Sequence, residues 1–144
     1  MTAAPDRSNV VALDAHREDD LALVAPGDYL ARYVRHVGVA IFRTRKLRVD
    51  FRLLDYPQPV ILPRWYRVID CRGGRIRARP TSSLVREVQS VLGVRVRHDR
   101  IPVASLADHE VMVRVRTVTT DHEQRELTSI NQYSVVERIL ERVT

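Results

Sequence analysis

Cysteine is almost absent from this sequence, and its scarcity limits what the protein can be. Cys71 is the single cysteine in 144 residues, so no disulfide framework can form within the chain and a reduced, cytoplasmic setting is expected. Long hydrophobic runs are also missing. No stretch approaches the roughly 18 apolar residues of a membrane-spanning helix, so no membrane partner is expected. The apolar stretch at 10–16 is too short for a signal peptide and leads into the acidic run at 17–20.

Lysine and aromatic residues are scarce too, whereas arginine is abundant. Aromatic residues make up 6% of the chain, and Lys46 is the one lysine among 24 basic residues. The formal net charge is +6 and the isoelectric point is about 10.2. A basic domain of this size is typical of proteins that bind a polyanion. Because an arginine bias is also typical of a GC-rich genome, charge alone leaves both interpretations open.

Charge divides the chain into two parts. Residues 1–26 carry two basic and five acidic residues and show no sustained hydrophobic period. We predict that this segment is an acidic, mostly disordered leader and a candidate site for a protein partner. Residues 27–144 carry 22 basic and 13 acidic residues. Their strand-like patterning predicts one folded domain.

Alternation of apolar and polar residues predicts five strands. They cover residues 28–42, 46–55, 64–70, 110–120 and 132–140. Gly38 is a candidate for a bend or bulge in the first strand. A Gly-Gly turn at 73–74 predicts a hairpin, and a further short strand is a candidate at 94–97. The pattern at 81–93 predicts the one helix, because apolar residues recur at helical spacing between a Ser/Thr cap and a terminal glycine.

The order of these elements predicts the fold. Three strands, a helix and two further strands form the order of the OB-fold, a five-stranded Greek-key barrel. We therefore predict a mainly β domain with one helix, which forms an OB-like barrel with the helix between strands 3 and 4. Such barrels bind oligonucleotides on the face of strands 2 and 3 and through the loops that join strands 1–2 and 4–5. Other small β-barrels share parts of this order.

The second predicted strand carries the clearest functional pattern. Every second residue over 47–53 is apolar, whereas Arg48 and Arg52 lie on the opposite face. Trp65 in the next strand shares this outward parity. Exposed cations beside aromatic rings suit single-stranded nucleic acid, because the cations bind phosphates and the rings stack on bases. Trp65 and Phe42 are equally consistent with positions in the core.

The predicted nucleic-acid-binding residues lie on three strands and two loops. They are Phe42, Arg43, Arg45, Lys46, Arg48, Arg52, Trp65, Arg67, Arg114, Arg116 and Arg125. Arg114 and Arg116 are equally consistent with a solvated strand face. Asp50, which stands between Arg48 and Arg52, is predicted to make cross-strand ion pairs, which would use part of the basic patch for structure.

Catalytic chemistry has little support in the sequence. None of the histidines has metal-ligand spacing to another; they are His16, His36, His98, His109 and His122. The tripeptide Asp-His-Glu occurs at 108–110 and 121–123, at opposite ends of one predicted strand, so the two copies are too far apart for one metal site. No phosphate-binding glycine loop is present, because the pattern at 71–75 indicates a hairpin turn. We expect no enzyme activity, no metal and no cofactor.

Four stretches carry a family resemblance: GDYLARYV at 27–34, KLRVDFRLLD at 46–55, RWYRVID at 64–70 and QYSVVERIL at 132–140. In their order along the chain and their pattern of residues, they resemble the OB-fold single-stranded DNA-binding proteins of phages and integrating mobile elements. The resemblance implies a non-catalytic protein that binds single-stranded DNA in replication or recombination of a bacterial mobile element. Such proteins often end in an acidic tail that recruits partners, whereas the acidic segment of this chain is N-terminal.

Two other classes of function fit the sequence. A protein-interaction module, for example an inhibitor of a host defence complex, could use the same basic barrel face against an acidic protein. A nuclease would need clustered carboxylates, for which Asp50, Asp55 and Asp70 are the candidates on neighbouring strands. The sequence leaves open whether RNA replaces DNA and whether the protein forms a homo-oligomer.

Overall fold

The computed structural model describes residues 22–121, 123–128 and 131–144, so most of the predicted leader lies outside the described residues. The described end of that leader contacts the folded domain. Ala22 and Val24 pack against the core, the Ser134 N–H donates to the Ala22 carbonyl at 2.8 Å, and the Val24 N–H donates to Ser134 Oγ at 2.9 Å. Contacts with the core therefore begin five residues before Gly27, where the strand pattern of the sequence starts.

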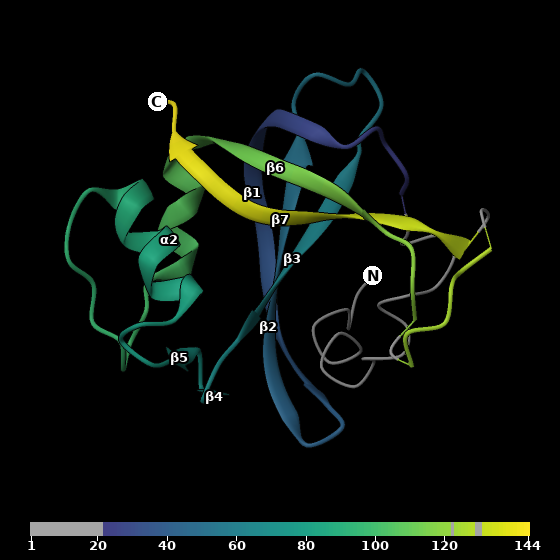
Figure 1. Cartoon of the computed structure of the whole chain (residues 1–144). Coiled ribbons are helices and arrows are strands. Elements are labelled where there is room, and N and C mark those ends of the chain that lie inside the picture. The colour runs from purple at the N-terminus through teal and green to yellow at the C-terminus, as the bar shows by residue number, and fades with distance from the viewer. Residues whose placement is uncertain (1–21, 122, 129–130) are drawn as a thin grey trace, which may run out of the picture.

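The protein is mainly β, as predicted, with a five-stranded antiparallel sheet and one short α-helix (Figure 1). The strand order in the sheet is β3-β2-β1-β6-β7. The elements are β1 (Gly27–Ile41), β2 (Thr44–Leu53), β3 (Ile61–Arg67), β4 (Asp70–Arg72), β5 (Arg75–Arg77), α2 (Ser83–Leu92), the 3₁₀ helix η3 (Val103–Asp108), β6 (Glu110–Val118) and β7 (Tyr133–Arg142). Strands β4 and β5 form a separate hairpin. The candidate strand at 94–97 does not form.

Strand β1 is long enough to pair with two different neighbours. Its first part, Gly27–Arg32, pairs with β6, and Ala31–Ile41 pairs with β2. The register with β2 shifts between Tyr33 and Arg35, so the bulge lies there and not at Gly38. Gly38 serves a different purpose: a Cβ at this position would lie 2.9 Å from the Cys71 Cβ, closer than packing allows. Glycine therefore lets the β4–β5 hairpin approach β1.

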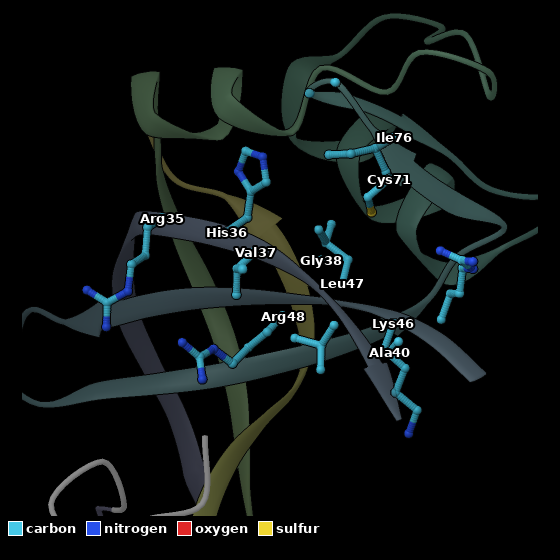
Figure 2. A pocket seen from close by; sticks show the side chains of 14 residues that line it. Arg35, His36, Val37, Gly38, Ala40, Lys46, Leu47, Arg48, Cys71 and Ile76 are labelled. Atoms are coloured by element: carbon cyan, nitrogen blue, oxygen red, sulfur yellow. The ribbon is translucent and has the colours of Figure 1, made fainter. Parts of the chain in front are cut away.

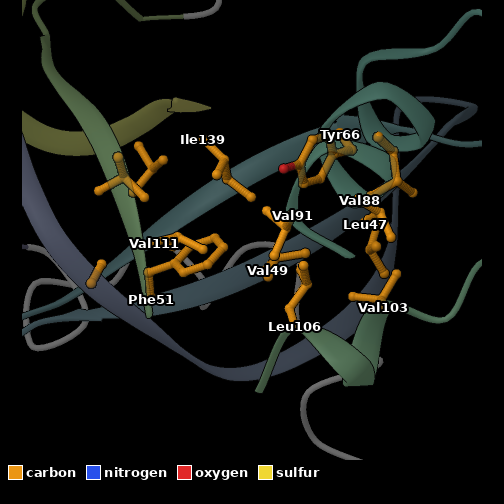
Figure 3. Packing of buried hydrophobic residues seen from close by; sticks show 14 of the residues in the cluster. Leu47, Val49, Phe51, Tyr66, Val88, Val91, Val103, Leu106, Val111 and Ile139 are labelled. Carbon is orange, nitrogen blue, oxygen red and sulfur yellow. The ribbon is translucent and has the colours of Figure 1, made fainter. Parts of the chain in front are cut away.

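Strand β2 supplies the centre of the core, as its alternation predicts. Leu47, Val49, Phe51 and Leu53 are all fully buried. They meet Tyr66 of β3 and residues of α2, η3 and β7 in one cluster (Figure 3). Because successive side chains of a strand point to opposite faces, this burial turns Lys46, Arg48, Asp50 and Arg52 to the other face of β2.

Strand β3 begins at Ile61, three residues earlier than predicted, and includes Pro63. A proline within a strand suggests a loop because it cannot donate to the hydrogen-bond ladder. It is accommodated here because β3 is the edge strand of the sheet and pairs only with β2. Tyr66 and Val68 are buried, as the parity argument predicts, whereas Trp65 and Arg67 alternate with them.

Helix α2 begins and ends where the sequence predicts. Ser82 Oγ accepts from the Val85 N–H at 3.2 Å, and Gly93 adopts the left-handed conformation that ends the helix. The buried face of the helix packs against β7, η3 and β3. No helix in the described part of the chain is long and apolar enough to cross a membrane.

The carboxylate of Glu87 connects α2 to both ends of the strand order. Arg64 of β3 binds it with a shortest N–O distance of 2.7 Å, and the Tyr66 hydroxyl donates to Oε1 at 2.5 Å. The Ile139 N–H of β7 donates to the same Oε1 at 3.1 Å. Strands β3 and β7, although not neighbours in the sheet order, come close in space at this point. Glu87 thus bridges the gap between them.

Candidate nucleic-acid interface

The β1–β2 hairpin ends in a two-residue turn with an unfavourable backbone. Ile41 pairs with Thr44, and the two residues between them, Phe42 and Arg43, have φ values of 48° and 67°. Positive φ at both central positions defines the turn type that normally selects Asn-Gly. Side chains with a Cβ pay about 1–2 kcal/mol for this conformation. The Phe42 side chain is nevertheless 79% exposed, so burial in the core does not explain its presence.

Strands β2 and β3 place cations and the single tryptophan on one outer face. Their register sets Lys46 opposite Arg67 and Arg48 opposite Trp65. The Arg48 guanidinium carbon lies 6.0 Å from the centre of the Trp65 ring, at the limit of a cation–π contact. Like charges directly opposite each other on a sheet destabilise it. The cross-strand pair, or rung, of Lys46 and Arg67 therefore favours an anion between the two groups.

Asp50 is the buried counter-charge of this face. Its Oδ2 lies 2.8 Å from Arg35 Nε and its Oδ1 lies 3.3 Å from Arg48 Nε. The predicted cross-strand ion pair of Asp50 is thus present, with Arg35 of β1 as the partner opposite it. Arg48 Nε is buried but lacks hydrogen-bond geometry to any partner among the described residues. The N–H at Arg48 Nε therefore donates no hydrogen bond to a described residue.

A groove of about 690 Å³ runs along the β1–β2 hairpin (Figure 2). Both strands and the β4–β5 hairpin line it, and the Cys71 side chain points toward Gly38 (Figure 2). His36 belongs to the lining, and its Nδ1 lies 2.6 Å from the Tyr33 hydroxyl. Burial lowers the pKa of His36 and so favours the neutral ring.

The predicted binding residues fall into two groups. Arg43, Arg45, Lys46 and Arg67 form no ion pair with any described residue and lie at or near the hairpin and the β2–β3 face. Phe42, Arg48 and Trp65 join this group by position. We call these seven residues the hairpin face. Arg45 alternates with Lys46 along β2 and lies within electrostatic range of Asp70, on the side of the β4–β5 hairpin.

The remaining predicted residues lie apart from the hairpin face. Arg114 of β6 binds Asp28 at 3.0 Å, and Arg125 binds Asp121 and Glu123 of its own loop. Arg116 is exposed on β6, which does not adjoin β2. Arg52 is exposed on β2 but lies four residues from Arg48, toward the other end of the strand.

Carboxylates and the thiol offer little catalytic chemistry. No three His, Cys, Asp or Glu side chains within residues 22–121, 123–128 and 131–144 are close enough to hold a metal ion. Asp70 is held by Arg77 at 2.6 Å, which lowers the pKa of its carboxyl. Burial, with Asp70 adding to it, raises the pKa of the Cys71 thiol and so disfavours the reactive thiolate.

Comparisons of this chain with protein-family models, curated proteins and solved structures find no match. The interpretation of the hairpin face thus depends on its own geometry and charge. Sequence reasoning missed the cations that complete the surroundings of the groove, which are Arg35, Arg72, Arg75 and Arg100. The symmetric Arg-Gly-Gly-Arg pattern at 72–75 was the available signal, since a two-residue turn sets its arginines opposite each other.

Proposed function

We propose that this protein binds single-stranded nucleic acid, with single-stranded DNA as the expected ligand, on the hairpin face. The observation that carries the proposal is the exposed Phe42 ring in a turn that would be more stable with Asn-Gly. Strain of this kind persists where it serves a function, and an outlier is a sound starting point for a functional hypothesis. An exposed aromatic ring beside cations is suited to stacking on a base.

The chemistry of the hairpin face supports the two parts of such binding. Arg43, Arg45, Lys46 and Arg67 have their charges available for phosphates, because no described acidic residue pairs with them. Phe42 and Trp65 provide ring faces that accept any base. Such a surface binds single strands with little dependence on sequence, since phosphates and base faces are common to all nucleotides.

The arrangement of the strands supports the same conclusion through the fold. The sheet order β3-β2-β1-β6-β7, the approach of β7 to β3 and a helix between β3 and β6 fit an OB-like barrel. In that fold, the face of strands 2 and 3 and the loop between strands 1 and 2 are the usual oligonucleotide site. The hairpin face occupies these positions. A role in replication or recombination of a mobile element follows from the sequence resemblance.

Titration with fluorescently labelled oligo-dT at several salt concentrations tests the proposal. Four cations without an ion pair to a described residue predict a slope of log K against log salt of about −3, at about −0.7 for each phosphate contacted. Arg45→Ala with Lys46→Ala should make the slope shallower by about 1.4. The matched control replaces Arg138 and Arg142, two exposed arginines of β7, and should leave the slope unchanged. Equal slopes for both double variants would reject the hairpin face as the binding surface.

A protein-interaction module is the second candidate, favoured by one observation. From Tyr33 to Ile41, the edge of β1 that faces away from β2 pairs with no other strand of the described chain. An exposed strand edge can accept a strand from a partner protein. If the protein fails to bind oligo-dT or oligo-rU even at low salt, this candidate replaces the first.

A further inference from the structure

The β4–β5 hairpin carries a second concentration of positive charge. Gly73 and Gly74, with φ values of 56° and 78°, form its two-residue turn, and this turn sets Arg72 directly opposite Arg75. Both arginines are exposed. Arg100 joins them around a hollow of about 480 Å³ at the side of the hairpin. Arg77 and Asp70, which bind each other, complete the lining of the hollow.

The arginine cluster, which we define as Arg72, Arg75 and Arg100, forms no ion pair with a described acidic residue, although Asp70 attracts Arg72 at longer range. The ion pairs of the described residues include none of the three. Asp70, the nearby carboxylate of the hollow, is bound by Arg77 through three hydrogen bonds. Because like charges opposite each other destabilise a strand pair, the Arg72–Arg75 rung favours a bound anion. The Lys46–Arg67 rung of the hairpin face repeats this arrangement.

The hollow and the groove are neighbours in space. Gly73 lines both of them, and Arg45 and Lys46 line the groove on its other side. A Cβ added to Gly73 or Gly74 would meet nothing within 4 Å, so this boundary is open. Cys71 closely approaches Gly38, so the two hairpins lie side by side at this point. A chain of phosphates that leaves the hairpin face along the groove would therefore reach the arginine cluster.

We propose that the arginine cluster is a second phosphate-binding site, which holds the backbone of the same single strand after it passes through the groove. This inference rests on the proposed function. The ligand class is a polyanion with several phosphates, because Gly73 adjoins both the arginine cluster and the groove that Arg45 and Lys46 line, so one extended chain can reach both sets of cations. An acidic protein segment is the competing occupant and is distinguished by the experiment.

Binding should depend on oligonucleotide length in a way that the arginine cluster controls. Oligo-dT of about 4 to about 16 nucleotides covers the usual site sizes of such folds. The shortest oligonucleotides should bind the wild type and the Arg72→Ala/Arg75→Ala variant equally. The longer ones should bind the variant about 25-fold more weakly at 0.1 M salt, with a slope shallower by about 1.4, because two phosphate contacts are lost. The Arg138→Ala/Arg142→Ala variant is the control for loss of two charges.

Thermal melting separates loss of binding from loss of folding. The Arg72→Ala/Arg75→Ala variant should melt no lower than the wild type, since it removes a repulsive rung. If long oligonucleotides bind the variant and the wild type equally, the second site is overturned while the proposed function stands. If the wild type binds no oligonucleotide of any length, the proposed function itself fails. If a poly-glutamate peptide binds in a cluster-dependent way and long oligo-dT does not, the occupant is an acidic protein segment and the inference is wrong.

Discussion

The strained turn at the tip of the β1–β2 hairpin allows stability and binding to be changed in opposite directions. Phe42 and Arg43 hold positive φ values of 48° and 67°, which Asn and Gly adopt at little cost. Replacing them by Asn and Gly removes about 1 kcal/mol of strain at each position. Glycine has more conformational freedom in the unfolded chain, and this offsets about 0.5–1 kcal/mol of the gain in stability. We expect the free energy of unfolding to rise by about 1 kcal/mol, or the melting temperature by about 3–4 °C.

The same double variant should bind oligo-dT more weakly. Loss of one stacked base costs about 1–3 kcal/mol in affinity, and loss of the Arg43 charge makes the salt slope shallower by about 0.7. Two single variants separate these effects. Phe42→Asn should lower affinity without changing the slope, whereas Arg43→Gly should change the slope. Phe42→Tyr keeps an aromatic ring and should retain most of the affinity.

Urea denaturation followed by circular dichroism measures the stability, and fluorescence anisotropy of labelled oligo-dT measures the affinity. Full affinity in a stabilised double variant would show that the exposed ring and the strain serve no purpose in binding. A double variant that is less stable than the wild type would refute the strain argument, because the backbone would then gain nothing from Asn-Gly.

Two further predictions concern the core and the groove. Glu87→Gln should lower the free energy of unfolding by about 3 kcal/mol, because it leaves the Arg64 guanidinium without its buried partner, whereas Tyr66→Phe should cost only about 1 kcal/mol. Equal losses in urea denaturation would show that the charge of Glu87 is unimportant. Since burial lowers the pKa of His36 from 6.5, the unfolded chain gains a proton first, and stability should fall as the pH drops below about 6.5. His36→Gln keeps an acceptor for Tyr33 and should reduce this dependence between pH 4.5 and pH 7; an identical profile for the variant would exclude His36 as its source.

The sequence determined the elements of this fold with little help from tertiary contacts. Strand β2 follows from its alternation alone, because one buried face requires every second residue to be apolar. Helix α2 follows from its cap residues and helical spacing. The start of β3 was missed because Pro63 suggests a loop, and only the position of β3 at the sheet edge makes a proline acceptable there. The bulge between Tyr33 and Arg35 likewise has no sequence signal of its own.

The binding surface depended more strongly on the tertiary structure. From the sequence, Phe42 and Trp65 were equally consistent with the core, and the structure shows that Phe42 is 79% exposed. The sequence does not show which arginines form ion pairs. Arg114 and Arg125 receive their acidic partners through strand pairing and loop shape, which only the folded chain provides. The folded structure decides which cations remain available to bind an anion. It does so through strand register, turn conformation and the close approach of two hairpins at Gly38. The sequence by itself therefore determined that the protein is basic and mainly β, and only the folded chain decided where that charge is free to bind.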